Sequence, residues 1–537
     1  MYIMNKYEIL KKFFPEKKKF RNVQELAIDA LLNNENVLCL MPTGSGKSLI
    51  YQVASLTIGK ATLVISPLIA LMNQQCNQLI KKGLDSVNFS GMDYKKQFRT
   101  ITDMVNHSLP KFIFTSPERI SNDGYLEYVL RIRREDIGLV VIDEIHCVSQ
   151  WGEGFRPAYK NIPLALNSIF GNNWPRILCL TATLNDKQQE QVQKEFHITK
   201  TIKGENLWRN NLHLKILNLK DGKDETKDQE LEKIIKNYNG EKILIFVHRK
   251  FGKKSTTRTL AEEYGKHYDG VAYFDSDLKD SDKEIVTQGF INGNIKIVFA
   301  TSAFGMGVDI KDIRVVVNYL ISETIEQYYQ EVGRGGRDGK PAYGYLLYTN
   351  QSKRGRKMLL NNTFCTEKSL RDEWNNRKLK EGHTFNHVSY DTMTDEQRIA
   401  FSLLIDYDII RIISKGVQSL KCFEPLTQEG SKFLDELTTY ARTGLTKVIV
   451  KKSGKNIEEL TLEIWSYCIN GDIRMKSAPS KAIFYTVNYE LNDDIVNKIL
   501  SDQETKKQAR VEAFEQFTNE IESGMTAEEI IRNKLNI

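Results

Sequence analysis

The sequence lacks long apolar segments. Its 537 residues contain no uninterrupted apolar run that approaches 18 residues, and the N-terminal stretch MYIMNKYEILKKFFPEKKKF has no apolar centre. A membrane helix needs about 20 apolar residues, and a secretion signal needs an apolar stretch before its cleavage site. We therefore expect neither a membrane span nor secretion.

Paired cysteines are missing as well. None of the seven cysteines belongs to a CxxC pair, and several lie inside apolar runs such as VLCLM. This usage is typical of a reducing compartment and not of a disulfide scaffold. The best zinc candidate combines Cys365 with His383 and His387, which have HxxxH spacing, but it offers a single sulfur. No zinc is expected.

A strong excess of one charge is also absent. The chain has 76 basic and 69 acidic residues, which gives a net charge of +7. This mild surplus is compatible with a polyanionic partner but does not establish one. Hydrophobic residues make up 41% of the chain, so it has enough apolar side chains for several folded domains.

The sequence does contain two series of short, nearly continuous apolar runs with helix-length segments between them. Five runs lie between residues 37 and 183, and five more lie between residues 242 and 349. Such runs are typical of buried parallel strands in βαβ units. We therefore predict two α/β domains, at residues 1–208 and 209–350, with the seam within residues 203–225.

The alternation stops beyond the second series. Residues 394–415 read as a helix and a strand, and SLKCFEP (419–425) reads as a further strand. A helix that feeds a short hairpin favours a small winged-helix-like unit, in a region that is otherwise mixed and mostly helical. From Asp493 onward we expect helices with a break at 524–526. The predicted C-terminal units are residues 351–430 and residues 431–537.

A phosphate-binding loop is the first motif that carries chemistry. The segment MPTGSGKS (41–48) follows an apolar strand and precedes a predicted helix. Its glycines let backbone N–H groups turn toward an anion at the helix N-terminus; Lys47 would reach the terminal phosphates of a nucleotide, and Ser48 would hold Mg²⁺. The alternative is an ordinary Gly-Ser turn. The predicted nucleotide-binding residues here are Thr43, Gly44, Ser45, Gly46, Lys47 and Ser48.

An acidic pair, Asp143 and Glu144, ends the apolar strand LVVID. One carboxylate would hold the magnesium ion, directly or through water, while its neighbour orients and deprotonates the attacking water. An acidic pair at a strand end is otherwise a common solvated turn, so the catalytic interpretation depends on the phosphate loop. Together the two motifs predict hydrolysis of a nucleoside triphosphate.

The second series supplies a basic counterpart in QEVGRGGRDG (330–339). Arg334 and Arg337 lie three residues apart, so both can face one target, and the glycines around them allow close approach to another surface. Two guanidinium groups from a separate domain would neutralise the γ-phosphate in the transition state. The alternative, an exposed basic turn, leaves the glycines unexplained.

The motifs and their order resemble the superfamily 2 helicases and, within them, the RecQ family of DNA helicases. The resemblance covers roughly residues 7–350 and implies two tandem RecA-like domains. It is carried by FRNVQ (20–24), MPTGSGKS (41–48), SPLIALMNQQ (66–75), TSPER (115–119), DEIHCVSQWG (143–152), TAT (181–183), ATSAFGMGVD (300–309) and YYQEVGRGGRDG (328–339).

The resemblance implies roles for further residues. Arg21 and Gln24 would recognise adenine, Asp309 and Gln330 would lie near the nucleotide, and Arg337 would be the arginine finger with Arg334 beside it. Asp143 would be the magnesium ligand. Contact with single-stranded DNA, or its coupling to the nucleotide, would involve Ser66, Pro67, Asn73, Gln74, Thr115, Trp151, Phe155, Arg156, Thr181, Thr183, Arg249 and Thr301.

Three aromatic residues, Trp151, Phe155 and Tyr159, follow the acidic pair on a segment whose glycines and proline oppose a regular helix. In the resembled family this loop senses single-stranded DNA, and stacking on bases contributes about 1–3 kcal/mol per base. Trp151 and Phe155 would engage bases or the neighbouring domain, with Arg156 on a phosphate. The alternative is a buried aromatic cluster that packs the loop.

The sequence departs from the family pattern in three places. Glu153 and Gly154 replace the usual His–Asp pair of the aromatic loop. This predicts that the coupling between DNA binding and the nucleotide site is weaker or involves other residues. PEKKK stands where an adenine-stacking aromatic is expected, which leaves Phe14 as the candidate. The four-cysteine zinc module expected after the motor is missing.

We therefore expect an ATP-dependent 3′–5′ DNA helicase that uses ATP and Mg²⁺ and acts on single-stranded and forked DNA in repair, recombination or genome defence. It would work in the cytoplasm at the nucleoid, or in the nucleus, and its C-terminal region would contact protein partners. Two alternatives stay open: an ATP-gated DNA-binding or translocating subunit without intrinsic unwinding, and an RNA helicase.

Overall fold

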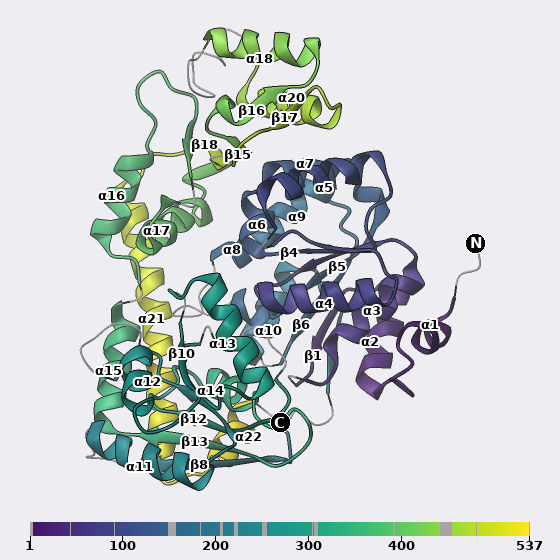
Figure 1. The fold of residues 1–537 in the computed structure, drawn as a ribbon. Coiled ribbons are helices and arrows are strands. Elements are labelled where there is room, and N and C mark those ends of the chain that lie inside the picture. The colour runs from purple at the N-terminus through teal and green to yellow at the C-terminus, as the bar shows by residue number, and fades with distance from the viewer. Residues whose placement is uncertain are drawn as a thin grey trace.

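In the computed structural model of this protein, two sheet-centred lobes lie beside each other and a C-terminal region contacts both (Figure 1). Every structural statement below concerns the described part of the chain. That part comprises residues 4–42, 44–90, 92–148, 157–182, 184–204, 208–219, 224–249, 255–275, 277–302, 304, 310–362, 364–389, 392–440, 454–478 and 481–535.

Lobe 1 is built on a seven-stranded parallel sheet of order β3-β4-β2-β5-β6-β1-β7. Helices cover both of its faces, so its central strands are buried at nearly every position. The strands are β1 (Val37–Leu40), β2 (Ala61–Ile65), β3 (Ser86–Asn88), β4 (Phe112–Thr115), β5 (Ile137–Ile142), β6 (Arg176–Thr181) and β7 (Lys200–Lys203). The helices are α1 (Lys6–Phe13), α2 (Asn22–Leu32), α3 (Lys47–Ile58), α4 (Ile69–Lys81), α5 (Tyr94–Asn106), α6 (Pro117–Asn122), α7 (Gly124–Ile132), α8 (Pro157–Lys160), α9 (Ile162–Phe170) and α10 (Asp186–Glu195).

Lobe 2 repeats this plan with a six-stranded parallel sheet of order β10-β11-β9-β12-β13-β8. Separate apolar cores fill its two faces. The strands are β8 (Leu212–Asn218), β9 (Lys242–Phe246), β10 (Val271–Phe274), β11 (Ile297–Ala300), β12 (Ile313–Asn318) and β13 (Ala342–Tyr348). The helices are α11 (Asp224–Asn237), α12 (Thr257–Tyr264), α13 (Asp280–Asn292) and α14 (Ile325–Val332).

The C-terminal region holds one three-stranded and one two-stranded sheet, with orders β14-β18-β15 and β16-β17. Its helices are α15 (Asn350–Asn362), α16 (Glu367–Arg377), α17 (Asp395–Asp406), α18 (Gln428–Tyr440), α20 (Ile457–Ile469), α21 (Asp493–Glu522) and α22 (Ala527–Leu535). Its strands are β14 (Asn386–Val388), β15 (Ile410–Val417), β16 (Phe423–Pro425), β17 (Ile473–Met475) and β18 (Lys481–Val487). In Figure 1 the long helix α21 runs from α16 and α17 down along lobe 2, while α18 and α20 lie above α5 and α7 of lobe 1.

The predicted fold class, two tandem RecA-like parallel-sheet domains and a mixed, mostly helical C-terminal region, is confirmed. All ten predicted strands of the two lobes are present, and so are the helix and strand of 394–415 and the helix break at 524–526. Three strands were not predicted: β3, β7 and β8. All three lie at or beside a sheet edge and are short or polar, so they lack a continuous apolar run.

The short hairpin predicted around SLKCFEP is wrong. Strand β15 pairs with the distant β18 instead, whereas Phe423–Pro425 of that segment forms β16 and pairs with β17. The sheet that contains β15 therefore joins residues on both sides of the predicted boundary at residue 430. The bounds of the four predicted domains remain predictions. Among the described helices, none combines the length and the apolar character that crossing a membrane requires.

Candidate nucleotide site between the lobes

The phosphate loop, residues 41–48, follows β1 directly and leads into α3. Gly44 and Gly46 have φ values of +76° and +86°, a conformation that favours glycine. The Ser45 hydroxyl donates to the carbonyl of Pro42 at 2.6 Å, which closes the turn. Lys47 Nζ is buried without a hydrogen-bond partner among the described residues, and it lies 3.8 Å from Glu144 Oε1.

Gln24 braces this loop from α2. Its Nε2 donates to the carbonyls of Ser45 and Gly46 at 3.2 and 3.1 Å, and its Oε1 accepts from the backbone N–H of Arg21 at 2.9 Å. The amide of Gln24 therefore bonds to the protein itself in this structure, while Arg21 is exposed beside it. Phe14, the candidate for adenine stacking, is 3% exposed and lies beneath Lys82, so its ring is not open to a nucleotide here.

The acidic pair follows β5 at the edge of the sheet next to the phosphate loop. Asp143 donates its backbone N–H to the carbonyl of Ile65 at 2.9 Å, and Glu144 has a left-handed φ of +51°. Burial and the adjacent Glu144 raise the pKa of Asp143 to about 6. Burial opposes ionisation of Glu144 as well, but Lys47, His146 and Arg334 together outweigh it and lower the pKa of Glu144.

His146 connects this carboxylate to a neighbouring strand. Its Nδ1 lies 3.3 Å from Glu144 Oε2 and 3.1 Å from the hydroxyl of Thr181, which ends β6. Burial opposes protonation of His146, yet Cys147 and Glu144 raise its pKa. Sequence reasoning did not assign a role to His146, although its place two residues after Glu144 was visible. Through His146, Thr181, which is predicted to couple nucleotide state to DNA, is connected to the carboxylate of Glu144.

Tyr159, the last of the three aromatics after the acidic pair, is fully buried and donates its hydroxyl to the carbonyl of Asp143 at 2.8 Å. It is therefore buried and supports the acidic pair, and for this one residue burial agrees with the alternative interpretation of the aromatics. The other two aromatics, Trp151 and Phe155, lie outside the described residues. The same holds for these predicted site residues: Thr43, Arg156, Thr183 and Asp309.

The arginine loop, residues 333–340, reaches across from lobe 2. A Cβ placed on Gly44 would lie 3.8 Å from Cγ of Arg337, so this side chain touches the phosphate loop. Burial and the nearby Arg337 lower the pKa of Arg334 to about 10, while Glu144 acts in the opposite direction. Arg334 also lies over the ring of Phe246, with Cζ 5.9 Å from its centroid. Both arginines thus approach the lobe 1 residues that handle phosphate.

The predicted DNA-contact residues differ in their exposure to solvent: some are exposed, some are half-buried and some are enclosed. Asn73 and Gln74 on α4 are exposed, and Thr301, Arg249 and the nucleotide candidate Gln330 are half-buried in lobe 2. The remaining four are enclosed, with at most 2% of the side chain exposed for three of them: Ser66, Pro67, Thr115 and Thr181. In this conformation the enclosed residues contact protein, and Ser66 is 3.5 Å from Asp143.

The residues fit a magnesium–nucleotide complex. The buried, unpartnered Lys47 Nζ matches a phosphate oxygen, and the oxygen ligands offered by Ser48 and Asp143 suit Mg²⁺. Among the described residues no group of three His, Cys, Asp or Glu side chains is placed to hold a metal.

Comparison with known proteins places the chain among the helicases. Residues 21–192 match the family described as "DEAD/DEAH box helicase" and residues 226–339 match the "Helicase conserved C-terminal domain". The chain is similar to the "ATP-dependent DNA helicase RecQ" of Bacillus subtilis, with 32% identity over 66% of this chain and 58% of the relative. It is also similar to "hus2/rqh1" of Schizosaccharomyces pombe, with 35% identity over 62% of this chain and 25% of the relative.

A third relative has a different description: the "Putative ATP-dependent RNA helicase R290" of Acanthamoeba polyphaga mimivirus, with 34% identity over 62% of this chain and 58% of the relative. Among solved structures, Mss116p bound to single-stranded RNA and AMP-PNP has a TM-score of 0.53 at 16% identity, over 70% of this chain and 85% of that one. At this identity the likeness concerns the fold alone.

The two lobes therefore correspond to the two conserved domains of superfamily 2 helicases. Over these domains the chain is similar to RecQ DNA helicases, as its motifs predicted. The chain spans 58% of the length of the Bacillus subtilis relative, and the similarity covers 66% of this chain.

Proposed function

We propose that this protein is an ATP-dependent DNA helicase that hydrolyses ATP when single-stranded DNA is bound, moves 3′ to 5′ and separates duplex strands. The observation that carries the proposal is the approach of Arg337 to Gly44 of the phosphate loop, with Lys47 and Glu144 beside it. Kinship with RecQ proteins supports DNA as the polymer and repair or recombination as the setting.

The chemistry follows from the residues around the phosphate loop. Lys47 would bind the terminal phosphates, and Glu144, whose lowered pKa keeps it ionised, would accept a proton from the attacking water. Mg²⁺, when held by Ser48 and Asp143, supplies charge neutralisation at the phosphates. Arg334 and Arg337 would stabilise the charge that spreads over the γ-phosphate in the transition state. Hydrolysis would thus depend on how closely the lobes approach.

A DNA-stimulated ATPase assay tests the proposal. We expect single-stranded DNA to raise ATP turnover by at least about tenfold, and Lys47→Ala to abolish turnover because the phosphates lose their cation. Lys60→Ala removes an exposed lysine at the opposite end of the sheet and serves as the matched control. An ATPase indifferent to nucleic acid would overturn the proposal.

Forked and tailed duplexes distinguish the proposed helicase from its alternatives. Separation of a duplex with a 3′ tail, but not one with a 5′ tail, supports 3′–5′ helicase activity. ATP turnover without strand separation favours an ATP-gated translocating or DNA-binding subunit that serves a protein partner. Stronger stimulation by RNA than by DNA of equal length favours an RNA helicase, the description given to the mimivirus relative.

A further inference from the structure

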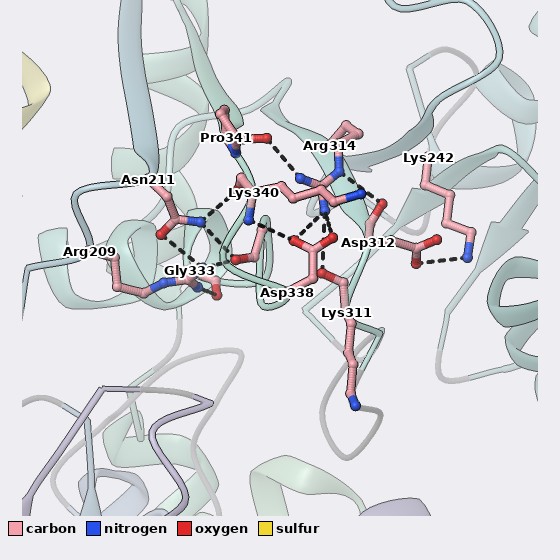
Figure 2. Close-up of polar contacts among 11 residues, drawn as sticks. Arg209, Asn211, Lys242, Lys311, Asp312, Arg314, Gly333, Asp338, Lys340 and Pro341 are labelled. Carbon is pink, nitrogen blue, oxygen red and sulfur yellow. Dashed lines mark hydrogen bonds and ion pairs between the residues drawn. The ribbon is translucent and has the colours of Figure 1, made fainter. Parts of the chain in front are cut away.

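The arginine loop is held from one side by the segment that links the two lobes. Arg209 donates from Nη1 to the carbonyl of Gly333 at 2.8 Å and from Nη2 to the carbonyl of Gly336 (Figure 2). Asn211 Nδ2 donates to the carbonyls of Gly336 and Lys340, at 2.8 Å each. Four donor contacts from two linker side chains therefore hold this loop.

The two carbonyl groups that accept from Arg209 belong to the residues directly before Arg334 and Arg337. Gly333 directly precedes Arg334, and Gly336 directly precedes Arg337. Because a peptide unit is planar, fixing the carbonyl oxygen of one residue also fixes the N–H and the Cα of the next. Arg209 thus fixes the peptide planes from which both arginine side chains start.

The guanidinium group suits this task because its N–H donors lie in one rigid plane. A lysine ammonium offers a single point of charge and cannot span two carbonyls in a fixed geometry. Asn211 complements Arg209 at Gly336, whose φ is +58°, and a Cβ on Gly336 would come within 2.6 Å of Asn211 Nδ2. A side chain at position 336 would therefore collide with Asn211, so this contact requires glycine at position 336.

The opposite side of the arginine loop is held by lobe 2 itself. Arg314 donates to both carboxylate oxygens of Asp338 at 2.7 Å (Figure 2). The backbone N–H groups of Gly336 and Asp338 donate to the carbonyls of Ile313 and Lys311. These contacts move with lobe 2 as one body. The contacts from the linker are different because the linker also continues into lobe 1.

That continuation is short. Gly204 donates its backbone N–H to Leu40 at 3.0 Å, and Leu40 ends β1 directly before the phosphate loop. Four residues lie between Gly204 and Arg209, so their Cα atoms are at most about 17 Å apart. The residues that hold the arginine loop are therefore close in sequence to a residue that is bonded to lobe 1.

The charges around the arginine loop also link its position to an anion between the lobes. Burial and the neighbouring Arg337 guanidinium lower the pKa of Arg209, so two cations lie near each other at this loop. Arg334 adds a third, and its pKa is lowered by burial and by Arg337. An anion bound between the lobes offsets this repulsion. Without an anion, the repulsion disfavours the close approach of these arginines.

We infer that Arg209 and Asn211 are positioning residues that set the direction of Arg334 and Arg337 and couple it to the spacing of the lobes. The inference rests on the proposed ATPase function, since the arginines act on the nucleotide. Within the described residues, neither linker side chain forms a hydrogen bond with the phosphate loop, so each acts through the arginine loop.

Steady-state ATPase assays on the full-length chain with saturating single-stranded DNA test this role. We expect Arg209→Gln and Asn211→Ala to lower kcat by about 10–100-fold, since misplacing a catalytic group by about 1 Å costs about 100-fold, and to change the KM for ATP by less than about threefold. Arg209→Lys keeps the charge but not the fork, and we expect a similar loss. Asp312→Asn is the matched control because its side chain bonds Lys242, at 2.9 Å, and not the arginine loop.

A second measurement separates positioning from folding. The affinity for ADP with aluminium fluoride, which imitates the transition state, should fall in Arg209→Gln while the affinity for ADP alone and the thermal midpoint stay near those of the wild type. Equal loss of both affinities, or full activity in Arg209→Lys, overturns the positioning role. An unaltered kcat in Arg209→Gln overturns it alone, whereas a wild type without ATPase activity overturns the proposed function and this inference together.

Discussion

Helices α21 and α22 enter the core of lobe 2 with apolar side chains, whereas β15, β18 and α20 meet lobe 1 through apolar side chains and through ion pairs beside α7. The apolar residues of α21 and α22 that lie in the lobe 2 core and are at most 2% exposed share this core with strands β11, β12 and β13. They are Phe514, Phe517, Ile521, Ala527, Ile530 and Ile531. The two helices are therefore part of the folded lobe and not an appendage to it.

The attachment to lobe 1 combines ion pairs with apolar packing, since Phe484 shares a buried core with residues of α7. Lys415 of β15 forms an ion pair with Glu127 on α7, and Lys481 of β18 lies 3.9 Å from Asp123. An aromatic contact accompanies them: the rings of Tyr125 and Trp465 are 5.2 Å apart. Most of the polar partners on the lobe 1 side thus lie on or beside α7.

This difference bears on how the two attachments respond to salt. Apolar burial persists in salt, whereas charge pairs near the surface weaken with it and re-form readily. We therefore expect salt to weaken the ion pairs with lobe 1 and to leave the apolar contacts with both lobes in place. A C-terminal region attached to both lobes would limit how freely the arginine loop approaches the phosphate loop.

The largest expected effect comes from the apolar side. Phe517→Ala leaves a cavity beside Tyr328, whose ring is 6.4 Å away, and we expect the free energy of unfolding of lobe 2 to fall by about 3–5 kcal/mol. Denaturant unfolding followed by tryptophan fluorescence measures it. Glu512→Ala, exposed on the same helix, is the control and should change it by less than about 0.5 kcal/mol. Equal midpoints for the two variants would mean that α21 is not part of the lobe 2 core.

A smaller effect is expected on the charged side. Lys415→Glu places two carboxylates together where the side chains are 9% and 16% exposed, and should weaken docking on lobe 1 by about 1.5–3 kcal/mol. Glu127→Lys added to it restores opposite charges and should restore docking. Energy transfer between dyes on α7 and α20 measures docking, with the stability of lobe 2 as an internal reference. Docking that survives Lys415→Glu would assign the attachment to the aromatic contact.

Features that depend on contiguous residues could be predicted from the sequence. Continuous apolar runs predicted the buried strands, and local spacing predicted the phosphate loop, the acidic pair and the two arginines. The contacts that join these motifs were not. His146 with Thr181, Tyr159 with the Asp143 carbonyl, and Arg209 with the arginine loop each unite residues that only folding brings together.

The C-terminal region shows the same limit. The helices α21 and α22 and their break at 524–526 followed from charge-rich helical patterning and a Gly-Met-Thr interruption. Which lobe they join did not follow, because the apolar face of α21 is completed by residues such as Tyr328, far away in the chain. The pairing of β15 with β18 was missed for the same reason, since the segment between them forms other elements.

The smallest expected effect concerns a pair at the margin of the lobe 1 contact. Lys160 Nζ lies 3.3 Å from Asp406 Oδ2, with side chains 16% and 33% exposed. Asp406 also faces Lys506, whose pKa is lowered by burial and by Lys160 and raised by Asp406. Removing the carboxylate with Asp406→Asn leaves two lysines facing each other, so we expect docking on lobe 1 to weaken by about 0.5–1 kcal/mol at low salt.

Salt distinguishes this pair from the apolar attachment. Raising the ionic strength from about 0.05 M to about 1 M shortens the screening length to about 3 Å and should erase the difference between Asp406→Asn and the wild type. The same change should leave the effect of Phe517→Ala intact. A difference in docking that persists at high salt would mean that Asp406 acts through packing and not through charge. This pair would then no longer be evidence for a charged contribution to the attachment on lobe 1.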